Sequence, residues 1–128
     1  MARRLISSGG PWEGSAGYSR AVGVGEACWV SGTTDAGPDG RSRHPGDPGG
    51  QARAILGVIE QALAEAGFAL ADVVRTRIYV TSMAECAGPV LAAHGEVFAS
   101  VRPAATLVEV SALIEPSLMV EIEAEARR

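Results

Sequence analysis

The residues of this chain that could do acid–base chemistry are few, and the most regular group lies near the carboxyl end. Glu121, Glu123 and Glu125 alternate with apolar residues, so a strand of period two would put all three carboxylates on one face. Carboxylates are among the few groups left in this chain that could carry chemistry. Two alternatives stay open: the glutamates are solvated, or some of them line a cleft.

The two histidines and the two cysteines form no pattern typical of a metal or nucleophile site. His44 lies in a loop rich in proline and glycine and His94 on an expected helix, without the further ligands that zinc needs, so we interpret both as surface residues. Cys28 and Cys86 sit among apolar residues, which favours core packing over a reactive thiol. We therefore expect two reduced thiols in a cytoplasmic protein, with a disulfide as the less favoured alternative.

The composition excludes several other kinds of chemistry. All 11 basic residues are arginine, so a lysine Schiff base, pyridoxal phosphate anchoring and a Walker phosphate loop are excluded, and we expect neither a cofactor nor a metal. The glycine motifs at 14–17 and 23–25 lack the spacing of a hydrolase elbow or a dinucleotide fingerprint and are interpreted as turns. The net charge of -4 and the lack of a long apolar run predict neither nucleic acid nor membrane as a partner.

The elements that must position these residues fit a single domain, residues 1–128, because this length is typical of one domain. Two helices are expected. The first has Asp47 as its cap, turns an apolar stripe toward a sheet and ends at Gly67. The second follows a capping box at 82–85 and is expected to be irregular near Pro89.

Six strands complete an α+β fold in the order βββαβαββ, which favours one mixed sheet with two helices on one face. On the fourth strand, Val74 and every second residue after it should share a face. The loop Thr33 to Gly50 should be exposed and mobile. Since monomers seldom leave a large apolar sheet face in water, oligomerisation through the bare face is expected if that face is apolar. The strands are expected at 3–7, 18–24, 28–32, 73–81, 106–110 and 118–126.

Several segments, spread over nearly the whole chain, carry a family resemblance. They are Gly17-Tyr18-Ser19-Arg20-Ala21-Val22, Val30-Ser31-Gly32, Asp72-Val73-Val74-Arg75-Thr76, Arg102-Pro103-Ala104-Ala105-Thr106, Val108-Glu109-Val110 and Val120-Glu121-Ile122-Glu123-Ala124. In this order and spacing they resemble the Rid (reactive intermediate deaminase, YjgF-like) family, which is also called endoribonuclease L-PSP. The resemblance implies a chorismate-mutase-like fold and a homotrimer whose sheets form a central β-barrel, with ligand clefts between neighbouring subunits.

The resemblance also implies an activity and a set of site residues. Members of the best-known type hydrolyse enamines and imines of 2-amino acids to 2-keto acids and ammonia, without metal or cofactor. Glu121 matches the carboxylate that positions or activates the attacking water, while Tyr18 and Ser31 would line the cleft. The backbone around Gly32 and Leu107 would offer hydrogen bonds to the ligand. A solvated strand glutamate and a half-buried strand tyrosine are the alternatives for Glu121 and Tyr18.

The chain departs from the family pattern at the substrate-binding strand. Ala105 stands where the deaminases have an arginine that grips the substrate carboxylate, and losing a charged hydrogen bond costs about 1.5–3 kcal/mol. Arg102 could replace that arginine only by reaching back around the turn, and is otherwise a surface or interface residue. Leu107 is apolar where some members have cysteine, so the pocket looks less polar than that of the deaminases.

Three functions follow from these observations. The first is an enzyme that hydrolyses an imine, an enamine or a related reactive metabolite, with an atypical substrate because of Ala105. The second is a non-catalytic or regulatory small-molecule binder that uses the same cleft. The third is a ribonuclease or translation inhibitor, which the net acidity and the lack of a basic stripe disfavour.

Overall fold

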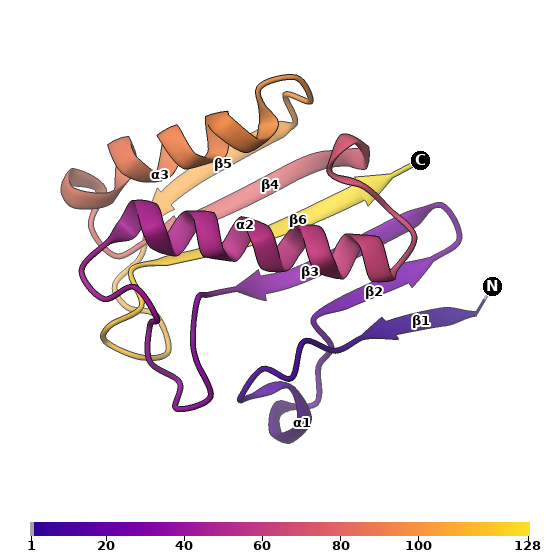
Figure 1. Ribbon diagram of the computed structural model, residues 1–128, viewed down its shortest axis with the longest axis horizontal. Helices are drawn as coiled ribbons and strands as arrows, with labels where there is room; N and C mark the ends of the chain where they lie inside the picture. Colours follow the sequence, from indigo (N-terminus) through magenta and orange to yellow (C-terminus); the bar gives the residue numbers. More distant parts are fainter. Residues whose placement is uncertain (1) are drawn as a thin grey trace.

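The computed structural model describes residues 2–128, which form one mixed sheet with two long helices on one face (Figure 1). The strands are β1 (Arg3–Ile6), β2 (Ala21–Val24), β3 (Ala27–Thr33), β4 (Val73–Val80), β5 (Ala104–Glu109) and β6 (Val120–Arg127). The helices are α1 (Glu13–Ala16), α2 (Pro48–Glu65), α3 (Met83–Phe98) and the 3-10 turn η1 (Leu70–Asp72). The predicted α+β class and order of the main elements are confirmed, whereas α1 and η1 were not expected.

The strands lie side by side in the order β1-β2-β3-β6-β4-β5. Neighbouring strands are antiparallel except for β4 and β5, which are parallel and are joined through α3. A parallel pair needs such a crossover, since a tight turn cannot return the chain to the same end of the sheet. The carboxyl-terminal strand β6 therefore lies in the middle of the sheet, between β3 and β4. Within residues 2–128, no helix is long and apolar enough to cross a membrane.

Helix α2 begins and ends as its sequence predicts. The Asp47 carboxylate accepts a hydrogen bond from the backbone N–H of Gly50 at 2.9 Å, and Pro48 occupies the first helical turn, where its missing N–H costs nothing. The chain leaves the helix at Gly67, whose φ of 86° is one that glycine adopts without steric cost. The cap and the stop signal together fix the helix across the sheet.

Helix α3 is capped as predicted but is not interrupted. Ser82 Oγ accepts a hydrogen bond from the N–H of Glu85 at 3.2 Å, and the Glu109 carboxylate of β5 accepts one from the N–H of Met83 at 2.7 Å. The helix continues through Pro89, so the predicted irregularity is wrong. Pro89 and Glu85 are both exposed, and the Glu85 carbonyl that lacks an N–H partner can therefore bind water.

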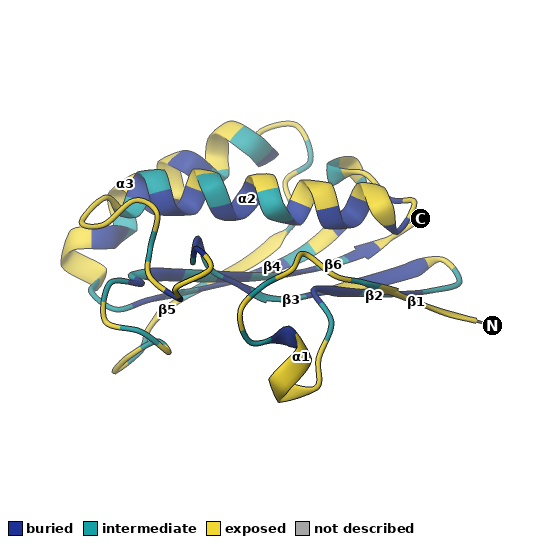
Figure 2. Cartoon of the chain, turned by 60° about the horizontal axis from the view of Figure 1, so that its bottom comes forward, coloured by how far each residue is buried: buried dark blue, intermediate teal, exposed yellow. Residues whose placement is uncertain are grey.

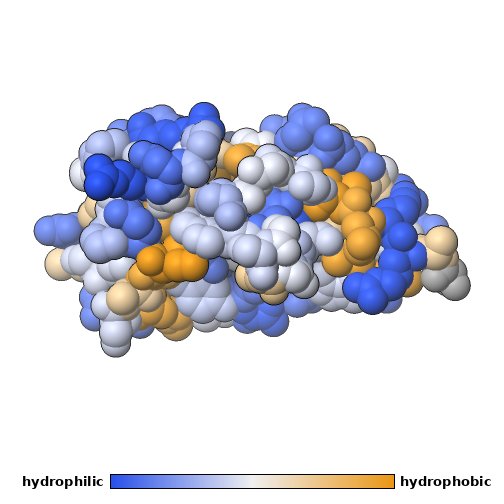
Figure 3. Space-filling model, turned by 90° about the horizontal axis from the view of Figure 1, so that it is seen from below, coloured by the Kyte–Doolittle hydropathy of each residue, from blue (hydrophilic) through white to orange (hydrophobic). Residues whose placement is uncertain are grey.

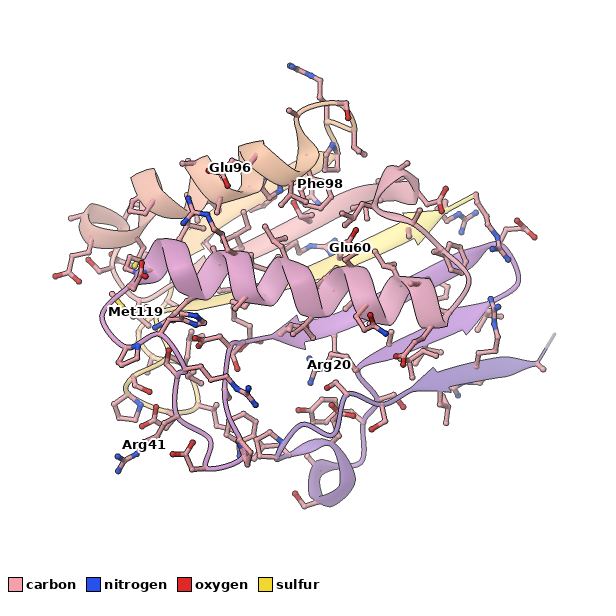
Figure 4. The ribbon with its side chains drawn as sticks, in the orientation of Figure 1. Arg20, Arg41, Glu60, Glu96, Phe98 and Met119 are labelled. Carbon is pink, nitrogen blue, oxygen red and sulfur yellow. The ribbon has the colours of Figure 1, made fainter. Side chains whose placement is uncertain are left out.

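The apolar core lies between the two long helices and the sheet, as the buried sides of α2 and α3 in Figure 2 show. Strand β6 supplies alternate residues to it, in agreement with the predicted period of two. The Arg53 guanidinium of α2 and the Glu96 carboxylate of α3 form an exposed ion pair at 3.1 Å, which joins the two helices. Figure 4 shows Glu96 on α3. The largest fully buried apolar side chains are those of Ile55, Leu56, Ile59, Leu63, Ile78, Leu118, Ile122, Val80, Val90 and Val120.

One residue of β4 is displaced from its predicted face. The pairing with β6 shifts between Val73 and Arg75, which is a bulge in the strand. Val73 is consequently buried and Val74 is 46% exposed, so the prediction that Val74 shares the buried face is wrong. From Thr76 onward the alternation is as predicted.

The face of the sheet opposite α2 and α3, called the outer face below, carries the alternating glutamates. Glu123 accepts a hydrogen bond from the Tyr79 hydroxyl at 2.5 Å. Glu125 forms an ion pair with Arg77 at 3.0 Å. Glu123 and Glu125 are thus paired with side chains of β4, whereas Glu121, on the same face, has no such partner among residues 2–128 and lies against Gly32 of β3.

Candidate active site

A cavity of about 760 Å³ lies beside the end of β3. Its walls come from the segment before α1, from β3 and the loop that follows it, from α2, and from Glu121 on β6. The side of the molecule that carries α1 and this loop has a largely polar surface interrupted by separate apolar patches (Figure 3). The cavity has the size and mixed lining that a small-molecule site needs.

A bulge in β3 forms the floor of the cavity. Val30 pairs with Ala124 and Thr33 with Ile122, so three steps along β3 match two steps along β6. Because of the extra residue, the alternation of buried and exposed residues is broken here. Ser31 and Gly32 are both partly exposed, and the residues on either side of them are buried. Bulges are frequent next to active sites because they redirect backbone and side chains in this way.

The Glu121 carboxylate lies directly against the backbone of Gly32. A Cβ atom built on Gly32 would overlap Glu121 Oε2 and lie 3.0 Å from Cδ, so only glycine leaves room for the carboxylate at this place. Glu121 is half-buried and accepts no hydrogen bond from any group in residues 2–128. Burial raises its pKa above the ordinary value, although the positive charge of Arg20 opposes this shift and Glu123 adds to it.

The Arg20 side chain holds the bulge of β3 in place through hydrogen bonds. Its Nη1 donates to the carbonyl of Gly32 at 2.6 Å and to Thr33 Oγ1 at 2.9 Å, and its Nη2 donates to the Tyr18 hydroxyl at 3.4 Å. The guanidinium also lies over the Tyr18 ring, 5.5 Å from the centroid. Arg20 is only 6% exposed, and Figure 4 places it at the end of β3 beside the segment that leads to α1. It fixes the backbone on which Glu121 rests.

A buried carboxylate, Glu13 at the start of α1, supports Arg20. Glu13 accepts hydrogen bonds from Ser7 Oγ at 3.0 Å, Ser8 Oγ at 2.5 Å and the N–H of Gly10 at 3.1 Å, and lies 3.5 Å from Arg20 Nε. Burial alone would raise the pKa of Glu13, but these hydrogen bonds outweigh it and keep the pKa below its usual value. The segment before α1 is therefore folded around one carboxylate.

Four of the residues predicted from the sequence come together here. Tyr18, Ser31, Gly32 and Glu121 all line the cavity, although they lie on three different segments of the chain. Ser31 Oγ donates to the carbonyl of Ser19 at 2.6 Å, so its hydroxyl position is fixed by the protein. Tyr18 is 37% exposed, and its hydroxyl is oriented by Arg20.

The other three predicted residues lie at the far edge of the sheet. Ala105 and Leu107 are on β5, separated from β6 by β4, and Arg102 precedes that strand. None of them lines the cavity of their own chain. Ala105 is exposed beside Thr76, and Leu107 is half-buried against the core. Arg102 is exposed, has a φ of 56°, and forms no ion pair with residues 2–128.

The histidines are less isolated than their positions in the sequence indicate. His94 is half-buried, with its Nε2 2.9 Å from Thr76 Oγ1 and its ring against Phe98, and burial lowers its pKa. His44 lines the cavity and contacts the buried side chain of Asp35. The predicted surface location is therefore wrong for His94, which is half-buried. His44 is at the surface as predicted, but it also lines the cavity. Among residues 2–128, no three His, Cys, Asp or Glu side chains are grouped so that they could hold a metal.

The two cysteines are free and buried, as predicted. Burial raises the pKa of both thiols, which makes them poor nucleophiles. Acid–base chemistry in the cavity must therefore come from Glu121, Asp35 and His44, with the Tyr18 hydroxyl beside them. This set can move protons to and from a small polar molecule.

The fold and the cavity define a small α+β protein in which a helix-covered sheet carries a half-buried acid on β6, beside the bulge of the neighbouring strand β3. The model of the family described as Endoribonuclease L-PSP matches residues 12–128, and the chain belongs to this family. Both the family and the chorismate-mutase-like fold predicted from the sequence are confirmed.

Several known proteins are similar to this chain. The Mycobacterium tuberculosis protein Rv2704, described as a member of the YjgF/YER057c/UK114 family, is 46% identical, with a TM-score of 0.89 over 99% of this chain and 100% of that one. The Streptomyces coelicolor protein SCO2049 is 39% identical over 99% of this chain and 93% of its own length. The YjgF gene product of E. coli is 27% identical, with a TM-score of 0.82 over 98% of each chain.

Proposed function

We propose that this protein is a small-molecule enzyme that hydrolyses an imine, an enamine or a related reactive metabolite. The proposal rests mainly on the position, the lack of hydrogen-bond partners and the raised pKa of Glu121. Its carboxylate lies against the Gly32 backbone in a cavity, has no hydrogen-bond donor within residues 2–128, and has a pKa above the usual value. A carboxylate with free lone pairs and a raised pKa is a good base for a water molecule.

The reaction needs no group that the chain lacks. Water adds to the carbon of a C=N bond while Glu121 removes one of its protons. The resulting carbinolamine then expels ammonia and leaves a C=O bond, so that imine and water become carbonyl compound and ammonia. The protein has to orient the water and move protons, and both tasks lie within the reach of Glu121 and its neighbours.

The substrate should differ from that of a typical 2-imino acid deaminase. Ala105 offers no charge for a carboxylate, and the Arg20 guanidinium is already bound to Gly32, Thr33 and Tyr18. A substrate carboxylate would therefore lose a charged hydrogen bond worth about 1.5–3 kcal/mol. An imine or enamine that is neutral, or that carries its acid at another position, fits this lining better.

We also propose that three copies associate through their outer faces into a central β-barrel. Large apolar side chains of this face are exposed, among them Leu5 at 63%, Trp29 at 46% and Val108 at 39%, and contact with a second copy would cover such side chains. Because β5 is an edge strand, its backbone around Ala105 and Leu107 and the exposed Arg102 side chain could then reach the cavity of a neighbour. Analytical ultracentrifugation tests this directly, since a stable monomer would remove the inter-subunit cleft.

A cytoplasmic location is part of the same proposal. Its support is the state of Cys28 and Cys86, which are both free. Free thiols are what a reducing compartment maintains.

The test of the activity is ammonia release from imines generated in the assay. The panel should contain 2-iminobutyrate and 2-iminopropionate together with imines that lack a carboxylate, and the protein should accelerate the second group more. Glu121→Gln should abolish the acceleration. Glu60→Gln, at an exposed position of α2 and away from the outer face, is the control and should keep it. No acceleration of any imine over buffer would refute the proposed activity.

A non-catalytic binder that uses the same cavity is the second candidate. The apolar residues favour it, since Ala105 stands where the deaminases have an arginine and Leu107 where some members have cysteine. Thermal-shift measurements with small carboxylates and neutral carbonyl compounds distinguish the two. Stabilisation that persists in Glu121→Gln, without turnover in the wild type, would support the binder.

A further inference from the structure

The cavity contains a second acid that the proposed chemistry of Glu121 does not use. Asp35, just beyond β3, has a side chain that is 0% exposed. Its Oδ2 accepts hydrogen bonds from Ser42 Oγ at 2.8 Å and from the N–H of His44 at 3.0 Å, and lies 3.0 Å from His44 Nδ1. Its Oδ1 is also buried and has no hydrogen-bond partner within residues 2–128.

This contact favours one of the two nitrogens of His44 as the one that carries the proton. A carboxylate only accepts hydrogen bonds, so its contact with Nδ1 is favourable when Nδ1 is protonated. Nε2 then holds the lone pair and is the basic nitrogen of the neutral ring. The His44 side chain is 44% exposed and lines the cavity, whereas the carboxylate behind it is completely covered.

The loop that carries this pair is held firmly to the rest of the fold. Gln51, fully buried at the start of α2, donates to the carbonyl of His44 at 3.1 Å and to that of Ser117 at 3.0 Å. The N–H of Ser42 donates to Ser117 Oγ at 2.9 Å. The loop is therefore held by both the helix and the segment before β6, while Asp35 orients the His44 ring. The sequence predicts an exposed and mobile loop, but Asp35 within it is buried.

Holding the loop together explains only part of this arrangement, the bonds of Oδ2 to Ser42 and to the His44 N–H. It does not explain why Oδ1 is buried without a donor, which costs about 1–3 kcal/mol, or why the carboxylate also contacts the ring of the exposed His44. A histidine oriented by a buried carboxylate at a cavity wall is instead the arrangement that proton-transfer sites use.

We propose that His44, positioned by Asp35, is a second proton-transfer residue of this cavity and acts on the carbinolamine that Glu121 helps to form. The inference rests on the proposed hydrolysis. Both side chains line the same cavity, Glu121 from β6 and His44 from the loop after β3. Two groups are useful because the reaction must move one proton onto the nitrogen and another off the oxygen.

A protonated imine is hydrolysed in two stages, addition of water and loss of ammonia. Water attacks the carbon, one water proton passes to the Glu121 carboxylate, and the C=N electron pair returns to nitrogen to give a neutral carbinolamine. The Glu121 carboxylic acid then returns its proton to that nitrogen, His44 Nε2 removes the hydroxyl proton, the C–N bond breaks and C=O forms. Ammonia leaves, and the half-exposed His44 imidazolium releases its proton to solvent.

One measurement tests the arrangement of His44 without any substrate. Nitrogen-15 NMR of the histidine rings in alkaline buffer should show His44 with its proton on Nδ1, and Asp35→Ala should shift the population toward the Nε2–H form that free imidazole prefers. His44→Gln assigns the signals. A wild-type His44 with its proton on Nε2 would overturn the proposal.

The second measurement is turnover. His44→Ala should lower kcat by about 10²-fold or more, the usual contribution of a proton-transfer residue, and added imidazole should restore part of the rate. His94→Gln, which keeps a polar group beside Thr76, is the control and should change kcat less than about threefold. A His44→Ala rate equal to wild type, in a protein where Glu121→Gln is inactive, refutes only the role of His44. A wild type without ammonia release refutes the proposed function and this step together.

Discussion

Replacing Gly32 with alanine should separate the position of the Glu121 carboxylate from the stability of the fold. The new Cβ would overlap Glu121 Oε2 and lie 3.0 Å from Cδ, whereas carbon atoms pack at about 3.5–4.0 Å. The carboxylate must therefore move by on the order of 1 Å. A displacement of that size in a catalytic group costs about 10²-fold in rate, or about 2.7 kcal/mol in the barrier.

The same substitution should leave the fold nearly unchanged. Gly32 is not among the glycines with a positive φ, so alanine fits its backbone without strain. The group that must move is the end of a flexible side chain. A compatible glycine-to-alanine change also gains about 0.4–1 kcal/mol because it restricts the unfolded chain. The free energy of unfolding should stay within about 1 kcal/mol of wild type.

Ammonia release gives kcat, and urea unfolding gives the free energy of unfolding for the same samples. Gly57→Ala is the matched control, because Gly57 lies on the exposed side of α2 with no atom within 4 Å of a built Cβ. It should gain about 0.5–1 kcal/mol and keep full kcat. Full kcat in Gly32→Ala would refute the reasoning, since the carboxylate would then work equally well when displaced.

Three further substitutions follow from the same contacts. At neutral pH, Glu121→Gln should unfold at a higher urea concentration than wild type. The reason is that burial raises the pKa of Glu121. The stability that this group contributes is therefore present below its unfolded pKa and lost as the pH rises through its folded pKa. That advantage should vanish in urea unfolding at acid pH. Arg20→Met should cost about 3–5 kcal/mol in thermal unfolding, because it leaves Glu13 buried without its positive partner. Ile59→Ala, at a fully buried position of α2, should cost about 2–5 kcal/mol.

Much of the fold could be predicted because its signals are local. The cap at Asp47 and the stop at Gly67 are contained in the helix they bound, and the alternation of β6 assigns Glu121 to the outer face without any tertiary information. Val74 was misassigned because a bulge inserts one residue into β4, and nothing in the local sequence marks that insertion.

The rest of the site depends on contacts between distant residues. Arg20 lies in one of the segments that carry the family resemblance. Its role, however, follows from hydrogen bonds to Gly32 and Thr33, which are more than ten residues away. Asp35 and His44 meet only because the loop between them folds back. The one sequence signal for the burial of Arg20 is its position next to the apolar strand β2. A guanidinium buried there must have partners.

The pH dependence of kcat/KM tests the role of Glu121 most directly, because it reports the ionisation of the free enzyme. The wild-type value should fall on the acid side with a midpoint above the usual pKa of a glutamate, since a base must be ionised and burial raises the pKa of Glu121. Glu121→Gln should lower the rate by at least about 10²-fold and lose the part of that acid limb that is not due to His44. A wild-type profile that is flat through the acid range, or a Glu121→Gln rate equal to wild type, would contradict the account.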